Sequence, residues 1–219
     1  MKAFWEYPVT FAFTVFIFLL YPTVLIFVPL PYIHKYFYAT PGYFSPINWL
    51  LSIFFHNSPE HLLGNLLVLF LVGRVVEEKV GGLRWVLFFF LAGFFSVIAD
   101  SFIRYFIYGD YSPVAGASGA IAGLIAIAAL LSPLHIHIMG KKILFPVFAL
   151  LWFLAYSDVK NLHRDDRVAH WAHLAGFLSC FLTAYFLNAK QREELKNGFL
   201  INIVFFTLTM VLLYLLRNR

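Results

Sequence analysis

One serine of the chain stands in a setting that can activate its hydroxyl group. The stretch GASGAIAGLIA, residues 116–126, places Ser118 at the start of an apolar helix. The flanking Gly116 and Gly119 let the chain turn sharply and let another backbone approach. A serine hydroxyl becomes a nucleophile only when a base accepts its proton, and neutral histidine suits that role near pH 7. An isolated serine in such a helix usually only packs against a neighbour, so the rest of the chain must supply the base.

A candidate base lies in the stretch VAHWAHLAGFLSC, residues 168–180. His173 is followed there by Gly176, within a stripe of small residues that spans the segment. Small residues let membrane helices approach closely, and glycines and alanines also follow Ser118. The pattern therefore predicts that these two helices are in contact and that His173 is the base for Ser118.

Two further polar side chains can stabilise the oxyanion that forms when a serine attacks a carbonyl group. In HNSPEHLLGNLLVLF, residues 56–70, His61 and Asn65 are four residues apart, which places both on one face of a helix. Their side-chain donors would act together with the backbone N–H of Ser118, which lies in the first turn of its helix. Removing one donor of such a site typically costs roughly 3 to 4 kcal/mol of transition-state stabilisation.

The other polar residues allow several interpretations. Asp100 and Arg104 have the spacing of an ion pair on one helix face and are interpreted as structural. No carboxylate in an apolar segment is placed to orient His173, so the pattern favours a serine–histidine dyad over a triad. We expect no cofactor and no metal.

A transporter or metal permease is the alternative from another functional class. It would use as ligands the four histidines His56, His61, His170 and His173. Of these, His170 and His173 share a helix face. This alternative is weak because no helix pair carries the carboxylates that ion sites favour.

The composition requires a membrane around these residues. Of 219 residues, 62% are hydrophobic and only 12% are charged, and several apolar runs approach the roughly 20 residues that span a bilayer. We therefore predict an all-α polytopic bundle, a multi-pass protein of the cell membrane. The predicted helices lie near residues 9–30, 61–79, 84–107, 116–133, 143–157, 168–188 and 198–216.

Two of these helices, 116–133 and 143–157, are short for a full span. We expect them to begin or end within the membrane depth, where protein or a water-filled cavity surrounds them. The long connection over residues 31–60 ends in an apolar segment that is too short to cross, so it is expected to lie in the interface. The scattered basic residues behind the net charge of +5 fit a surface beside anionic lipid rather than nucleic-acid binding.

Together these motifs resemble the rhomboid intramembrane serine proteases. The nucleophile motif Gly-x-Ser-Gly of that family stands at residues 116–119, and its Ala-His-x-x-Gly signature stands at 172–176. Its second-helix pattern stands as His56, His61 and Asn65. Three motifs in the expected order are far more specific than any one of them.

The resemblance implies a fold, an activity and a partner. It implies a six-helix catalytic core, taken as residues 1–190, followed by a loop and a seventh transmembrane helix in 191–219. It implies a serine endopeptidase with catalytic Ser118 and His173 that cuts transmembrane segments of other membrane proteins. A catalytically inactive member of the family that binds membrane clients is the alternative, and the oligomeric state is not predicted.

Three positions depart from the pattern of the family. Ala122 stands where an aromatic residue commonly stacks on the catalytic histidine, and Cys180 stands where the helix-six motif usually ends in glycine. Ile47 and Asn48 replace a Trp-Arg pair of the first loop. These departures affect the fine geometry more than the reaction.

The resemblance also implies a route for the substrate. A transmembrane segment would pass sideways between the second and fifth helices. Phe148, Trp152 and Phe153 on the fifth helix can form a moving wall there, although the simpler interpretation is that these bulky residues face lipid.

Overall fold

The computed structural model describes residues 6–138, 141–163 and 168–217, and most of them are helical. Within these ranges, four helices are long and apolar enough to cross a membrane. They are α2 (Pro8–Phe27), α5 (Pro59–Val80), α6 (Gly82–Ile103), which continues into the π-helix η1 (Arg104–Tyr108), and α11 (Ala189–Arg217). The prediction of a helical protein with several membrane-spanning helices is confirmed.

Shorter elements complete the fold. The helices are α3 (Leu30–Tyr36), α4 (Pro46–Ser52), α7 (Ser118–Leu131), α8 (Val147–Asn161), α9 (His170–Leu178) and α10 (Cys180–Ala184). The helix predicted over 168–188 is thus divided into α9 and α10 at Ser179, whose Oγ donates to the Gly176 carbonyl at 2.7 Å. The apolar end of the long connection contains the short helix α4, and its expected position in the membrane interface stays a prediction.

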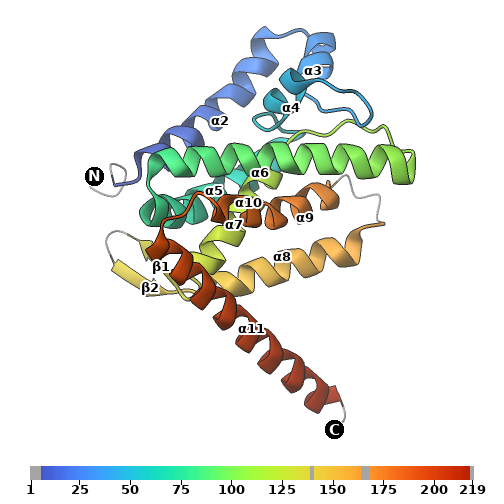
Figure 1. The fold of residues 1–219 in the computed structure, drawn as a ribbon. Coiled ribbons are helices and arrows are strands. Elements are labelled where there is room, and N and C mark those ends of the chain that lie inside the picture. Colours follow the sequence, from blue (N-terminus) through green and yellow to red (C-terminus); the bar gives the residue numbers. More distant parts are fainter. Residues whose placement is uncertain (1–5, 139–140, 164–167, 218–219) are drawn as a thin grey trace.

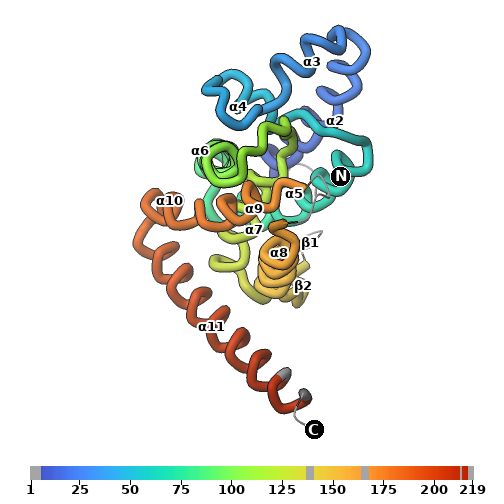
Figure 2. Tube along the Cα trace, turned by 90° about the vertical axis from the view of Figure 1, so that its right-hand side faces the viewer, coloured from blue at the N-terminus to red at the C-terminus, as the bar shows by residue number. Residues whose placement is uncertain are grey.

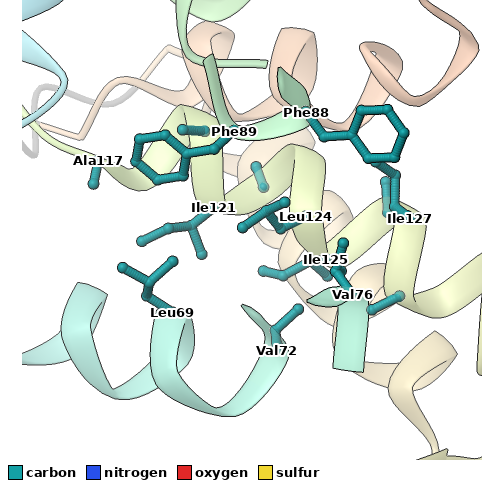
Figure 3. Packing of buried hydrophobic residues seen from close by; sticks show 14 of the residues in the cluster. Leu69, Val72, Val76, Phe88, Phe89, Ala117, Ile121, Leu124, Ile125 and Ile127 are labelled. Carbon is teal, nitrogen blue, oxygen red and sulfur yellow. The ribbon is translucent and has the colours of Figure 1, made fainter. Parts of the chain in front are cut away.

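Helix α7 lies at the centre of the bundle and packs against α5, α6, α8, α9 and α11 (Figures 1 and 2). Every residue of α7 except Ser118 and Leu130 is buried, which confirms that protein surrounds this short helix. Figure 3 shows aliphatic side chains of α7 between those of α5 and the phenylalanines of α6: Leu69, Val72, Val76, Phe88, Phe89, Ile121, Leu124 and Ile125. Packing of this kind drives helix association in membranes, where lipid tails are as apolar as leucine.

The segment before α8 corrects the all-α prediction. Strand β1 (His135–Ile138) pairs antiparallel with β2 (Lys141–Leu144), so the helix predicted over 143–157 begins at Val147 and continues to Asn161. The reason lies in Pro146, which can precede a helix but cannot sit in its interior. The shift brings Asp158 inside α8, whereas the prediction had left it beyond the helix.

The C-terminal helix begins earlier than predicted. The expected loop before residue 198 is helical, because α11 starts at Ala189. Asn188 and Gln191 form a reciprocal cap: the Gln191 N–H donates to Asn188 Oδ1 at 2.9 Å, and the Asn188 N–H donates to Gln191 Oε1 at 3.0 Å. The residues that follow, QREELK, are good helix formers. Figures 1 and 2 show that α11 then runs away from the other helices toward the C-terminus.

Candidate functional site

Ser118 is the first residue of α7, and the loop before it is held in place by backbone hydrogen bonds. The Gly116 N–H donates to the Ser52 carbonyl at 2.9 Å, and Val114 forms an isolated β-bridge with Ala39. Gly116 has a φ of +155°, a conformation that residues with a side chain rarely adopt. The loop therefore presents Ser118 at a helix start whose first N–H groups have no intrahelical acceptor.

His56, which lies between α4 and α5 in the chain, contacts the same loop. Its Nε2 accepts a hydrogen bond from the Ala117 N–H at 3.4 Å. Burial, reinforced by the neighbouring His61, lowers the pKa of His56 to about 3. The neutral ring can therefore act as an acceptor, and we assign His56 a structural role.

His61 lies beside the nucleophile loop. Ser58 caps α5 by accepting the His61 N–H at 3.2 Å, and Pro59 occupies the first turn. A Cβ added to Gly116 would lie 2.8 Å from Cε1 of His61 and 3.6 Å from Oγ of Ser118. The missing side chain of Gly116 thus lets the imidazole ring approach the serine hydroxyl.

Asn65 lies one turn further along α5. The residue is 9% exposed, and its Nδ2 has no hydrogen-bond partner within the described part of the chain. A buried amide donor without a partner costs about 1 to 3 kcal/mol. Such a cost is typical of a group kept for function, although Asn65 does not line the cavity that contains His61.

Helices α7 and α9 approach each other closely at their small residues. A Cβ added to Gly176 would collide with the Gly119 carbonyl oxygen and would lie 3.0 Å from Cβ of Ala122. Ala122 is buried against α9 and therefore does not face lipid. The predicted contact between the serine-bearing and histidine-bearing helices is present.

Ser118 and His173, from the two helices in contact, line the same cavity. The cavity has a volume of about 380 Å³, and its lining also includes His61, Gly116 and Gly119. Ser118 and His173 are both partly exposed. The predicted nucleophile, the predicted base and one predicted oxyanion donor thus face a common space large enough for water and a peptide group.

Asp158 is the residue that the sequence interpretation missed. Its Oδ1 lies 3.0 Å from Nδ1 of His173 and 2.7 Å from Nδ1 of His170. Asp158 is 5% exposed and projects from the part of α8 that the prediction had cut off. The expectation that no carboxylate contacts His173 is therefore wrong. The histidine pair at 170 and 173 was a usable signal, since two imidazoles on one helix face suggest a shared acceptor.

A second, more polar cavity adjoins the first. It has a volume of about 760 Å³, and the two cavities have four lining residues in common. These shared residues are Asn57, Val114, Val168 and Ala169. Asp100 and Asp110 line the second cavity and both contact Arg104, at 3.5 and 2.6 Å. The predicted Asp100–Arg104 ion pair is present, and this polar cavity lies next to the one that contains Ser118.

The aromatic residues of α8 partly contradict the lipid-facing interpretation. Phe148 is buried and stacks on Phe205 of α11 with ring centroids 4.9 Å apart. Trp152 donates from Nε1 to Asn202 Oδ1 at 3.1 Å. Only Phe153, 69% exposed, fits the lipid-facing interpretation. Phe148 and Trp152 of α8 therefore contact α11.

Asn48, which replaces part of the Trp-Arg pair, braces the first loop. Its Nδ2 donates to the carbonyl oxygens of Lys35 and Tyr38 at 2.5 and 3.2 Å. A buried amide thus ties α4 to the segment before it. We find no comparable explanation for Ile47, which is 64% exposed.

Comparison with known proteins agrees with the motifs. The family model of the Rhomboid domain matches residues 44–190. The Rhomboid protease GluP of Bacillus subtilis (strain 168) is 28% identical over 170 residues, which cover 75% of this chain and 31% of that protein. The chain thus corresponds to about a third of the length of this curated relative. The matched residues include the nucleophile loop, α5 and α9.

Proposed function

This chain belongs to the rhomboid family, and from that premise we propose that it is an intramembrane serine endopeptidase. One observation carries the proposal: Ser118, His173 and His61, from three helices, line the same cavity at the start of α7. A serine used only for packing would need neither a histidine across a cavity nor a glycine that admits a second imidazole.

The proposed reaction is acyl transfer followed by hydrolysis. Ser118 Oγ attacks the carbonyl carbon of the scissile peptide bond while Nε2 of His173 accepts the hydroxyl proton. The same imidazole then gives that proton to the leaving amine. Water from the adjoining polar cavity hydrolyses the acyl-enzyme, again with His173 as base, and Ser118 regains its proton.

Three donors would stabilise the oxyanion. They are the Ser118 N–H, the His61 ring and the Asn65 amide. The unsatisfied Nδ2 of Asn65 supports its part, because a donor kept without a partner in the resting protein is free to bind negative charge that develops later. Asn65 would gain access as the substrate widens the cavity.

The proposed substrates are transmembrane segments of other membrane proteins. We propose residues 1–190 as a six-helix catalytic core and residues 191–219 as an additional unit with a seventh span. The role of that unit would be mechanical, since α11 contacts α8 through Phe205 and Asn202. Movement of α8 would then have to carry α11 with it or break these contacts.

The direct test uses purified protein in liposomes with a model transmembrane substrate. Sequencing of the fragments should locate a cut within or next to the transmembrane segment, and Ser118→Ala protein should give no fragments. If the folded wild-type protein binds the segment but leaves it uncut, the client-binding alternative replaces this proposal.

We expect His61→Ala and Asn65→Ala each to lower kcat by about ten- to a thousandfold, because each removes an oxyanion donor and leaves the nucleophile. KM and the unfolding temperature should change little. Steady-state kinetics in liposomes and thermal unfolding in detergent check both points. Full turnover in both variants would contradict the oxyanion assignment.

A further inference from the structure

The two histidines of α9 and Asp158 of α8 form a cluster whose chemistry exceeds what the proposed reaction needs. Nδ1 of His170 and Nδ1 of His173 both contact the same carboxylate oxygen, and one ligand atom from each residue can be chosen so that all three lie within 4.8 Å. Catalysis calls for only one of these imidazoles. His170 is 6% exposed and has no part in the proposed reaction.

The cluster matches the ligand set of a zinc site. Two imidazole nitrogens and a carboxylate oxygen suit Zn²⁺ and similar divalent transition ions, with water as the fourth ligand. Bond lengths near 2.0 to 2.1 Å in a tetrahedron put ligand atoms roughly 3.3 Å apart. The two observed nitrogen–oxygen separations, 2.7 and 3.0 Å, are shorter than this, and the three ligand atoms lie within 4.8 Å of one another, so the side chains would have to shift slightly to hold the ion.

The cluster also has an access route. His170 lines the polar cavity of about 760 Å³, together with Asp100 and Asp110. Arg104 lies on the same walls and contacts both carboxylates, and His173 borders the neighbouring cavity that contains Ser118. An ion in the polar cavity can thus meet the cluster at His170, whereas Asp158 is buried and lines neither cavity.

We propose that Asp158, His170 and His173 bind a divalent transition-metal ion of the zinc class, and that binding switches the serine site off. An ionised carboxylate only accepts hydrogen bonds, so the His173 imidazole at rest carries its single proton on Nδ1, and its Nε2 can accept the Ser118 proton. A metal ion needs the lone pair of Nδ1, so Nδ1 must be unprotonated when it binds the ion. The single proton of the neutral ring is then on Nε2. His173 Nε2 then donates instead of accepting, so it cannot take the proton of Ser118.

The binding half of the proposal is independent of the proposed protease activity, and the inhibitory half rests on it. The two halves are therefore tested separately. Binding is measured by titrating Zn²⁺ into Ser118→Ala protein that carries no polyhistidine tag, in detergent micelles. We expect one Zn²⁺ per chain with micromolar or tighter affinity, and X-ray absorption of the bound ion should show two imidazoles and a carboxylate.

The decisive variant is His170→Asn, because the asparagine Nδ2 can replace the histidine Nδ1 as a donor to Asp158 but is a poor zinc ligand. It should weaken Zn²⁺ binding by at least about 10- to 100-fold. His163→Asn is the matched control, since His163 lines the same cavity outside the cluster and its loss should leave binding unchanged. Equal binding in both variants, or a bound ion without histidine ligands, overturns the site.

Inhibition is measured on wild-type protein with the model substrate. Zn²⁺ should stop cleavage over the concentration range in which it binds, and a chelator should restore it. His170→Asn protein should keep its activity in the same Zn²⁺. Cleavage that continues at full rate in protein saturated with Zn²⁺ overturns the switch while leaving the site intact. A wild-type protein that binds Zn²⁺ but never cleaves would refute the protease proposal instead.

Discussion

A fluorophosphonate probe is expected to label this protein once, on Ser118. The probe reacts with a serine only when a base activates the hydroxyl and donors stabilise the new tetrahedral centre. Peptide mapping after labelling gives the position. Ser118→Ala should lose the label and should lower proteolysis by about 10⁴- to 10⁶-fold.

The other serines near the site serve as internal controls. Ser96 donates to the Ala92 carbonyl at 2.6 Å, and Ser179 donates to the Gly176 carbonyl at 2.7 Å. Both hydroxyls are buried and engaged with their own helix. Ser101 is buried too. None of them lies at a helix start opposite a histidine, so a label on any of them would contradict the assignment of the nucleophile.

The base is tested with the same probe. His173→Ala should abolish labelling without unfolding the protein, whereas His170→Asn should still be labelled. Labelling that does not depend on His173 would refute the pair. Absence of labelling in folded wild-type protein would favour the client-binding alternative.

The sequence allowed the helices that carry the site to be predicted because their signals are local. Ser58 and Pro59 mark the start of α5, and the glycines at 119 and 176 allow α7 and α9 to meet. The apolar length of α2, α5 and α6 is a direct consequence of bilayer thickness. These features depend on neighbouring residues or on simple composition, so one sequence contains them.

The missed features depend on contacts between distant segments. The start of α8 depends on the hairpin before it. The predicted end at residue 157 stopped short of Asp158, because α8 continues to Asn161. Likewise, Phe148 looked like a lipid-facing residue because its partner on α11 lies far along the chain. An apolar side chain has the same signature whether lipid or another helix covers it.

Asp158→Asn is expected to lower kcat by about 10²- to 10⁴-fold while KM stays nearly unchanged. The Asp158 carboxylate accepts from Nδ1 of His173, which leaves Nε2 free to take the Ser118 proton. An asparagine amide can instead donate to Nδ1 and so hold the proton on Nε2, where it blocks the base. Asp158 would thus act as a positioning residue, and the serine–histidine pair would work as part of a triad. Kinetics with the model substrate separate kcat from KM.

Comparison with two other variants separates this role from simple loss of structure. His170→Asn keeps a donor to Asp158 and leaves the Asp158–His173 contact in place, so it should retain turnover. Asp158→Glu keeps the carboxylate on a longer side chain and should recover part of the rate lost in Asp158→Asn.

If Asp158→Asn is folded and cleaves at the wild-type rate, the carboxylate does not orient His173 and the dyad predicted from the sequence is sufficient. If Asp158→Glu is no better than Asp158→Asn despite equal unfolding temperatures, the charge of Asp158 is not what the reaction uses. A selective loss of kcat in Asp158→Asn, partly restored in Asp158→Glu, would follow only from a carboxylate that fixes the tautomer of His173, because lost packing would affect both variants and would lower the unfolding temperature as well.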